Sequence, residues 1–127
     1  MIYEYRVYVA TPGRMPEVNK RFREQTMTMF KKHAFRVVGF WEPAVGDTSE
    51  LHYILEWDDM AHMERTWAGF RTDPEWIEIR SKTEANGAIV SAVKNQIWRL
   101  CDYSPKPRAV LAHGRIPQHP RTDAPFP

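Results

Sequence analysis

The order in which two hydrophobic periodicities follow one another constrains the fold of this chain more than any other feature. Residues 2–9 alternate with a period of two and are rich in aromatic and β-branched side chains, which predicts a β-strand. Thr11-Pro12-Gly13 then breaks the strand, and apolar residues recur every three or four positions up to about His33. This second spacing predicts an amphipathic helix of about 18 residues.

The same two patterns continue in the rest of the chain. A predicted strand hairpin is followed by two helical segments that begin at capping aspartates, and then by a last strand. The strands cover residues 35–42, 51–57 and 89–100, and the helical segments follow Asp58-Asp59 and Asp73-Pro74. The order strand, helix, strand, strand, helix, strand predicts an α+β protein with the ferredoxin-like βαββαβ plan.

This plan gives a four-stranded antiparallel sheet. Right-handed connections place both helices on one face of the sheet and leave the other face bare. A bare face that carries aromatic residues needs a cover, and a second sheet can supply it. We therefore expect a homodimer whose two sheets pack face to face as a dimeric α/β barrel.

Composition restricts the number of domains and the class of partner. The 127 residues fit one domain, which we assign to residues 1–103. Residues 104–127 hold six of the ten prolines and show no periodicity, so we expect an extended C-terminal tail. The tail has four basic residues and one acidic residue, whereas residues 1–103 have 14 basic and 15 acidic residues. The near-neutral domain lacks the basic face that nucleic-acid binding requires.

Other sequence features bear on location. No apolar stretch approaches the roughly 20 residues that a bilayer-spanning helix needs. The first residues lack the basic and apolar regions of a signal peptide, and the single cysteine, Cys101, cannot form an internal disulfide. We therefore expect a cytoplasmic protein that does not act at a membrane.

The first strand carries the candidate catalytic group. Glu4, Arg6 and Tyr8 share one of its faces. If the helices cover the opposite face, these three residues point into a cavity between the sheets of the dimer. Arg6 could then bind an anionic or carbonyl oxygen, Glu4 could abstract a proton, and Tyr8 could stabilise an oxyanion. The alternative is a buried ion pair that only fixes strand pairing.

Aromatic residues on the hairpin could form the walls of the same cavity. We name Trp41, Tyr53 and Trp57 as substrate-binding candidates because flat aromatic walls suit a planar ligand. His52 is a further candidate, although it could face either the cavity or the helices. Trp67 and Trp76 lie at helical spacing, and we interpret them as core residues.

Metal and cofactor signals are weak. None of the five histidines has metal-ligand spacing with acidic or cysteine partners, so we expect no metal site. His62 could in principle be an axial haem ligand, but no other haem signal accompanies it. The sequence has no phosphate loop, dinucleotide fingerprint or serine nucleophile motif, and we expect no cofactor.

A set of short motifs spread over residues 1–105 resembles the NIPSNAP family, a branch of the dimeric α/β-barrel superfamily. The motifs are Met1-Ile2-Tyr3-Glu4-Tyr5-Arg6-Val7-Tyr8 with Pro12-Gly13, Phe30-Lys31-Lys32-His33, Val38-Gly39-Phe40-Trp41, Trp57-Asp58-Asp59-Met60, Trp67-Ala68-Gly69-Phe70, Asp73-Pro74-Glu75-Trp76, Lys82-Thr83-Glu84-Ala85-Asn86-Gly87 and Tyr103-Ser104-Pro105. The resemblance implies the fold and the dimer. Some family members carry a histidine where this chain has Tyr53, whereas its own His52 lies one residue earlier, on the opposite strand face.

The resemblance leaves several functions open, because the wider superfamily includes cofactor-free quinone-forming monooxygenases, lactone isomerases and haem-degrading enzymes. Our leading hypothesis is a small-molecule-binding homodimer that could act as a cofactor-free enzyme on a flat substrate with a carbonyl, phenol or carboxylate. The alternatives are a non-catalytic sensor or carrier, and a protein-interaction module that uses the tail. A haem-binding protein or a quinone-forming monooxygenase is less favoured.

Overall fold

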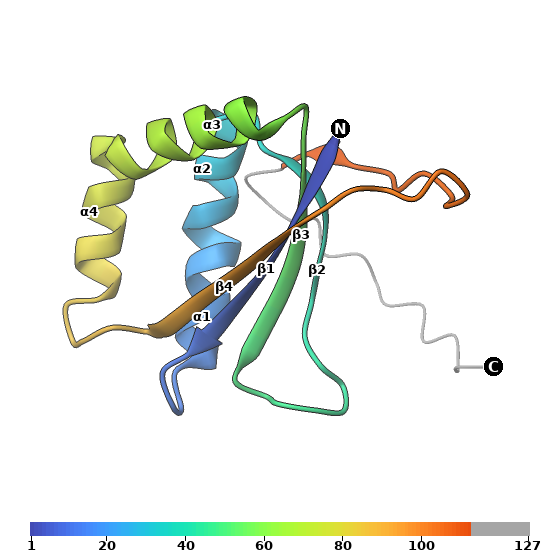
Figure 1. Cartoon of the computed structure of the whole chain (residues 1–127). Helices are drawn as coiled ribbons and strands as arrows, with labels where there is room; N and C mark the ends of the chain where they lie inside the picture. Colours follow the sequence, from blue (N-terminus) through green and yellow to red (C-terminus); the bar gives the residue numbers. More distant parts are fainter. Residues whose placement is uncertain (113–127) are drawn as a thin grey trace, which may run out of the picture.

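The computed structural model describes residues 1–112 and has the predicted order of elements (Figure 1). Its strands are β1 (Ile2–Ala10), β2 (Arg36–Trp41), β3 (Glu50–Trp57), β4 (Val90–Trp98) and β5 (Val110–Leu111). Its helical segments are α1 (Met15–Arg21), η1 (Phe22–Thr26), α2 (Met27–Lys32), α3 (Met60–Thr72) and α4 (Pro74–Thr83). The predicted α+β, ferredoxin-like plan is confirmed.

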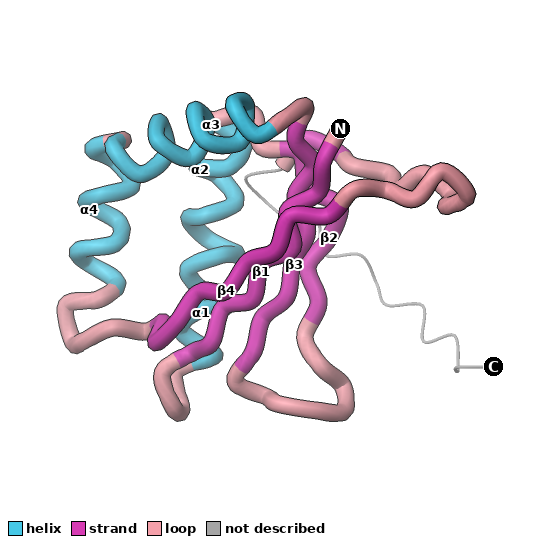
Figure 2. The backbone as a smooth tube through the Cα atoms, in the orientation of Figure 1, coloured by secondary structure: helices cyan, strands magenta, loops and turns pink. Residues whose placement is uncertain are grey.

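The strands form one antiparallel sheet in the order β4-β1-β3-β2-β5, and all the helices lie on one face of it (Figures 1 and 2). The sheet has five strands, so the predicted four-stranded sheet is wrong in this detail. Val110 and Leu111 pair with β2, and the Ala112 amide donates to the Phe35 carbonyl at 3.1 Å. A two-residue strand is too short to show a periodicity, yet it satisfies backbone groups at the β2 edge. Residues 113–127 of the predicted tail lie outside the described residues.

The first helical stretch spans the predicted length but contains a π-helical turn, η1, at its centre. The Met27 amide reaches back to the Phe22 carbonyl, five residues earlier. Such turns widen a helix locally. Arg21 and Phe22 at the start of η1 are both buried, so the widened turn sits directly against the core.

Aspartate caps separate α3 from the preceding strand and α4 from α3, as predicted. The Asp59 side chain accepts from the His62 amide at 2.8 Å, and the Asp73 side chain accepts from the Glu75 amide at 2.9 Å. Pro74 follows at the first position of α4, where its missing N–H is not needed. None of the helices in residues 1–112 is long and apolar enough to cross a membrane.

The core is an aromatic cluster between the sheet and the helices. Its largest fully buried members include Phe30, Phe35, Tyr53 and Trp57, and Trp67 packs against them edge-on. Each such ring removes enough apolar surface from water to contribute about 2–3 kcal/mol to folding. The cluster therefore fixes α3 against the sheet.

The orientation of β1 differs from our conditional prediction. Glu4, Arg6 and Tyr8 point toward the helices, because Glu4 and Arg6 both contact Trp67 on α3. The other face of the strand, with Tyr5, looks toward the side of the sheet that no helix covers. Period-two alternation defines two strand faces but does not say which of them is covered.

Candidate functional site

A buried carboxylate lies at the centre of the sheet's helix side. Glu4 is 1% exposed and accepts four hydrogen bonds. Its Oε1 accepts from the indole N–H groups of Trp57, at 3.1 Å, and Trp67, at 2.8 Å. Its Oε2 accepts from Arg6 at 2.9 Å and from Asn95 at 3.1 Å. A carboxylate offers about four lone-pair sites, so Glu4 is fully satisfied.

These donors determine the charge and the role of Glu4. Burial alone would raise the pKa of Glu4, but the hydrogen bond from Trp67, the charge of Arg6 and the Asn95 bond together lower it. The ionised carboxylate therefore has little tendency to take up a proton. The geometry favours a positioning role for Glu4 over the proton abstraction that we predicted for it.

Arg6 is held in one orientation by the groups around it. It is 7% exposed, and its Nε donates to the Tyr53 hydroxyl at 2.8 Å while one terminal nitrogen donates to Glu4. The guanidinium also lies 4.3 Å from the centre of the Trp67 ring. Burial opposes its charge, but Tyr53, Tyr8 and Glu4 outweigh burial and raise the pKa of Arg6. Arg6 is thus a fixed cation, and its other terminal nitrogen donates to no partner among residues 1–112.

Two phenols extend this arrangement. The Tyr53 hydroxyl accepts from Arg6, and its ring packs edge-on against that of Tyr8. Burial, followed by the effect of the neighbouring Tyr8, raises the pKa of Tyr53 well above its ordinary value. Tyr53 is completely buried, whereas Tyr8 is only half-buried. Tyr8 and Arg6 therefore present this network to the space beside it.

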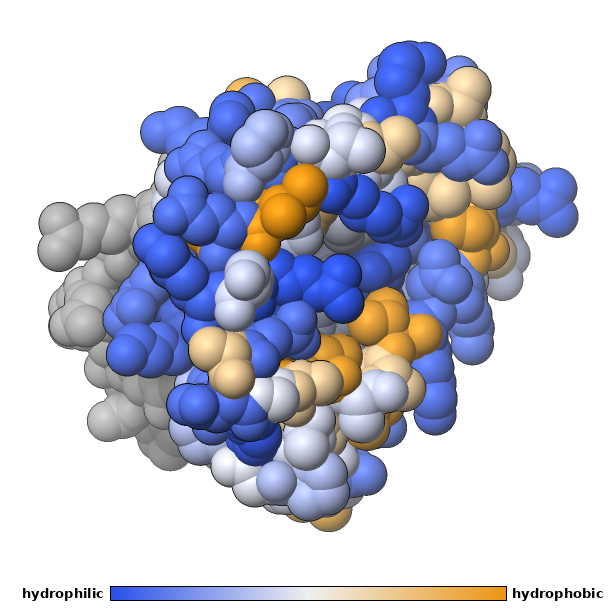
Figure 3. All heavy atoms as spheres, turned by 90° about the vertical axis from the view of Figure 1, so that its left-hand side faces the viewer, coloured by the Kyte–Doolittle hydropathy of each residue, from blue (hydrophilic) through white to orange (hydrophobic). Residues whose placement is uncertain are grey.

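That space is a cavity of about 340 Å³ between β1, β4 and the helices. Its walls combine aromatic rings with four arginines and one glutamate: Arg6, Tyr8, Arg21, Trp67, Phe70, Arg71, Trp76, Arg80, Glu84 and residues 90–93. A second recess of about 530 Å³ shares Arg71, Trp76, Arg80 and Glu84 with it and lies further out along α4. Hydrophilic side chains predominate on the face of the molecule that α4 presents (Figure 3).

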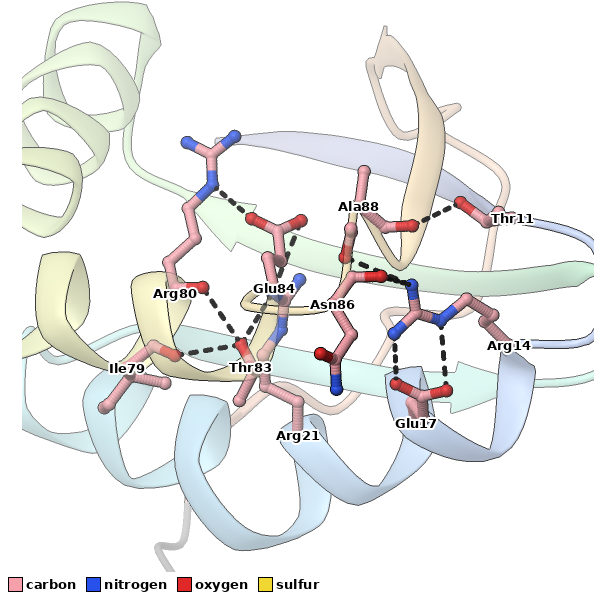
Figure 4. A network of polar contacts seen from close by, with 11 residues as sticks. Thr11, Arg14, Glu17, Arg21, Ile79, Arg80, Thr83, Glu84, Asn86 and Ala88 are labelled. Carbon is pink, nitrogen blue, oxygen red and sulfur yellow. Dashed lines mark hydrogen bonds and ion pairs between the residues drawn. The ribbon is translucent and has the colours of Figure 1, made fainter.

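The cavity contains a second buried arginine, Arg21, which is poorly paired. Its terminal nitrogen lies 3.9 Å from Glu84 and donates a long bond of 3.3 Å to the Thr83 hydroxyl (Figure 4). Its Nε has no hydrogen-bond partner within residues 1–112. Glu84 pairs more closely with Arg80, at 3.0 Å. The Arg21 guanidinium lies over the Trp76 ring at 5.3 Å. Burial lowers the pKa of Arg21.

A neighbouring network fixes the end of α4 beside the first helix (Figure 4). Arg14 pairs with Glu17 and donates to the carbonyls of Asn86, at 3.1 Å, and Gly87, at 3.2 Å. Gly87 has a φ of +106°, and a Cβ there would meet the Arg14 guanidinium at 3.4 Å. Glycine is therefore the residue that this turn accepts most easily.

The predicted substrate-binding residues fall on opposite sides of the sheet. Tyr53 and Trp57 lie on the helix side and contact Arg6 and Glu4. His52 lies on the open face, where it bonds to the Tyr5 hydroxyl at 2.5 Å and to Glu50 at 3.1 Å. Trp41 is the cross-strand partner of His52 and is half exposed. The seven candidates therefore do not form one site.

Sequence reasoning missed several cavity residues. Trp67 and Trp76 are buried as predicted for core residues, but both also line the cavity. A signal for them was present, because each tryptophan precedes an arginine by four positions, as Trp67 does Arg71 and Trp76 does Arg80. Residues four apart share a helix face. In residues 1–112 no three histidine, cysteine or acidic side chains converge on a point that could hold a metal ion.

The same fold is found in several solved structures. A NIPSNAP-family protein of unknown function from Agrobacterium tumefaciens is 22% identical, with a TM-score of 0.72 over 83% of this chain and 92% of that one. An uncharacterized NIPSNAP-like domain protein from Burkholderia xenovorans is 20% identical, with a TM-score of 0.74 over 86% and 92%. A putative antibiotic biosynthesis monooxygenase from Nitrosomonas europaea is 9% identical, with a TM-score of 0.55 over 78% and 97%. These identities show a shared fold and nothing more.

The family follows from the sequence itself. Among curated proteins, none matches the chain significantly. The model of the NIPSNAP family, however, matches residues 3–105, which include every residue of the Glu4–Arg6 network and of the cavity wall. Because this match covers most of its length, the chain belongs to the NIPSNAP family.

Proposed function

We propose that this protein binds a small, flat organic molecule in the cavity between the sheet and the helices. The observation that carries the proposal is the cation Arg6, which Glu4 and Tyr53 hold rigidly while it lines a cavity with aromatic walls. A volume of about 340 Å³ lies at the small end of the range for ligand pockets. The cavity therefore suits a ligand of about one ring.

The binding groups have distinct tasks in this proposal. The free terminal nitrogen of Arg6 donates to a ligand oxygen, and the Tyr8 hydroxyl offers a second hydrogen bond beside it. The rings of Trp67 and Trp76 supply flat apolar surface. Because Glu4 fixes Arg6 in advance, the ligand does not have to order that side chain when it binds.

A second candidate function is cofactor-free catalysis of a proton transfer. The observation in its favour is that Tyr8 lies at the cavity with the Arg6 guanidinium 5.7 Å from the centre of its ring. A phenol in this position can donate a proton to a developing oxyanion, which the nearby guanidinium also stabilises. Turnover of a bound molecule, absent in a Tyr8→Phe variant that still binds it, would separate this function from a sensor or carrier.

We also propose that the protein works as a homodimer through the open face of the sheet. Tyr5 and Trp98 stack there with ring centres 4.6 Å apart, and Trp98 is 41% exposed. No helix of the described residues lies on this face of the sheet (Figure 2). A second sheet would bury these rings. Sedimentation analysis would test this, and a species of one chain mass, 15.0 kDa, at micromolar concentration would contradict it.

Nuclear magnetic resonance can test the site because the five tryptophans report on different places. We suggest titrating isotope-labelled protein with benzoate, phenol and benzamide, and following the indole N–H signals. Binding in the cavity should shift the signals of Trp67 and Trp76 and leave that of Trp41, on the open face, unchanged. Shifts confined to Trp41 and Trp98, or no shifts with any of the three compounds, would contradict the proposed site.

A further inference from the structure

The charge of the cavity wall indicates which kind of oxygen-containing group the ligand carries. We propose that the ligand is an anion, a flat molecule with a carboxylate or a phosphate ester, and that Arg21 and Arg71 select it together with Arg6. This inference rests on the proposed function, because it assigns the ligand class of the same cavity. It excludes neutral carbonyl compounds and neutral phenols as the preferred ligands.

The first argument is that positive charge exceeds negative charge at the cavity. Four arginines line it and one carboxylate, Glu84, faces them. Glu84 is engaged mainly by Arg80, and Arg6 has its partner in Glu4 behind the wall. Arg21 then has only the distant Glu84, at 3.9 Å, and Arg71 has no carboxylate partner among the described residues. Unbalanced cations beside a partly closed space attract an anion more strongly than cations in water do.

The second argument is the state of Arg21. It is 6% exposed, yet its polar contacts are long and its Nε has none in the part of the chain that the structure describes. A buried guanidinium that lacks partners is costly, so native proteins keep one only where something compensates for it. An anionic group in the cavity would supply that compensation. The same group would explain why Arg21 lies at the cavity wall and not in water.

The third argument concerns shape. Guanidinium groups lie over both cavity tryptophans, Arg6 and Arg71 near Trp67 and Arg21 near Trp76. The cavity therefore alternates flat cations with flat rings. A planar ligand with an anionic end can stack on the rings while its oxygens bond to the cations. Carboxylate and phosphate share this chemistry, and a direct comparison of the two identifies the preferred one.

The test compares charged and neutral probes of nearly equal shape. Dissociation constants of benzoate, phenyl phosphate, benzamide and inorganic phosphate would be measured from the Trp67 and Trp76 indole signals. We expect benzoate or phenyl phosphate to bind at least about tenfold more tightly than benzamide, since a charged hydrogen bond contributes at least that factor. Whichever of the two anions binds more tightly identifies the group. The affinity should fall as sodium chloride is added.

Two separate arginines of α3 provide matched variants. Arg71→Gln removes an exposed cavity cation, and Arg65→Gln removes an exposed arginine of the same helix that does not line the cavity. Both positions are at the surface, so both variants should fold. Arg71→Gln should weaken binding of the anion about three- to tenfold and leave the affinity for benzamide unchanged. Arg65→Gln should change neither affinity.

Each other outcome overturns a defined part of the proposal. Equal affinities for benzoate, phenyl phosphate and benzamide would overturn the anion inference while the cavity remained a binding site. Inorganic phosphate binding as tightly as phenyl phosphate would overturn the requirement for a flat ligand. Equal losses in Arg71→Gln and Arg65→Gln would show a general charge effect and overturn the role of Arg71. No shift of Trp67 or Trp76 with any probe would overturn the inference and the proposed function together.

Discussion

The two faces of strand β1 carry different residues and have different surroundings. On the helix face, Glu4 and Arg6 are buried among aromatic rings, and each has polar partners at hydrogen-bond distance. On the open face, Tyr5 lies under a partly exposed Trp98 and bonds to the half-buried His52. Two charged groups of this strand are thus buried, whereas a large aromatic ring beside its other face is partly exposed, which departs from the usual distribution.

The difference shows what decides burial in this fold. A charge can be buried where hydrogen-bonding partners from several elements converge on it. Glu4 is such a case, because donors from β1, β3, β4 and α3 bond to its carboxylate. Apolar rings stay partly exposed where no element of the same chain reaches them. The helix face is therefore largely complete within one chain apart from its cavity, whereas the partly exposed rings of the open face are the basis for the proposed dimer.

The largest effect on stability should come from removing the buried carboxylate at the centre of the helix face. Glu4→Ala leaves Arg6 buried without its counter-charge and removes an acceptor from two tryptophans, so we expect a loss of about 3–5 kcal/mol in the free energy of unfolding. Urea denaturation measures the loss. Glu24→Ala, at an exposed position of η1, is the control and should change stability by less than about 0.5 kcal/mol. A loss below about 1 kcal/mol for Glu4→Ala would show that Arg6 finds another partner.

A change on the open face should weaken the proposed association of two chains and not the stability of one chain. Trp98→Ala removes the ring that stacks on Tyr5, and we expect the dimer to dissociate at least about tenfold more readily, since buried tryptophans often dominate interfaces. Sedimentation equilibrium measures the change. Ile77→Ala, which removes an exposed side chain on α4 at the helix side, should leave dimerisation unchanged. Equal effects of both variants would place the interface elsewhere.

The sequence predicts the fold well because its signals are local. Alternation, helical spacing and the caps Asp59 and Asp73 each depend on a few neighbouring residues, and all of them agree with the structure. The fifth strand depends on pairing between β2 and residues about 75 positions away, for which two residues give no local signal. The side of the sheet that the helices cover is likewise a property of the whole fold.

The site was predictable in part for the same reason. Glu4, Arg6 and Tyr8 are grouped by strand alternation alone, and the structure brings them together. Arg21, Arg71, Arg80 and Glu84 come from α1, α3, α4 and the end of α4, so their meeting depends on tertiary packing. His52 and Tyr53 show the limit clearly, because neighbours on a strand face opposite sides and only one of the two reaches Arg6.

Removing one buried hydroxyl from the helix face should have a smaller effect on stability. Tyr53→Phe removes the hydroxyl that accepts from Arg6, while it keeps the ring in the core. We expect a loss of about 1–2 kcal/mol, because Arg6 retains Glu4 but loses the acceptor for its Nε. Tyr103→Phe, at an exposed position, is the matched control and should have no measurable effect. If both variants unfold at the same urea concentration, the phenol does not hold Arg6.

The smallest effect is expected at the surface junction of α3 and α4, and it should depend on pH. Hydrogen bonds from Lys32, His33 and the Glu75 amide lower the pKa of Asp73 from 3.8 to about 2. Because the folded chain binds this proton less tightly than the unfolded chain, the contribution of Asp73 is complete above about pH 4 and is lost as the pH falls toward 2.

A serine isolates the charge at this junction, because Asp73→Ser keeps an oxygen that can cap α4 and removes only the carboxylate. We expect the variant to be less stable than the natural chain at pH 6, and the difference between the two urea midpoints to shrink at pH 3. Glu4 titrates in both proteins and cancels in that difference. Because serine keeps the cap, a gap that stays the same at both pH values would mean that Asp73 stabilises the junction through contacts that do not depend on its charge.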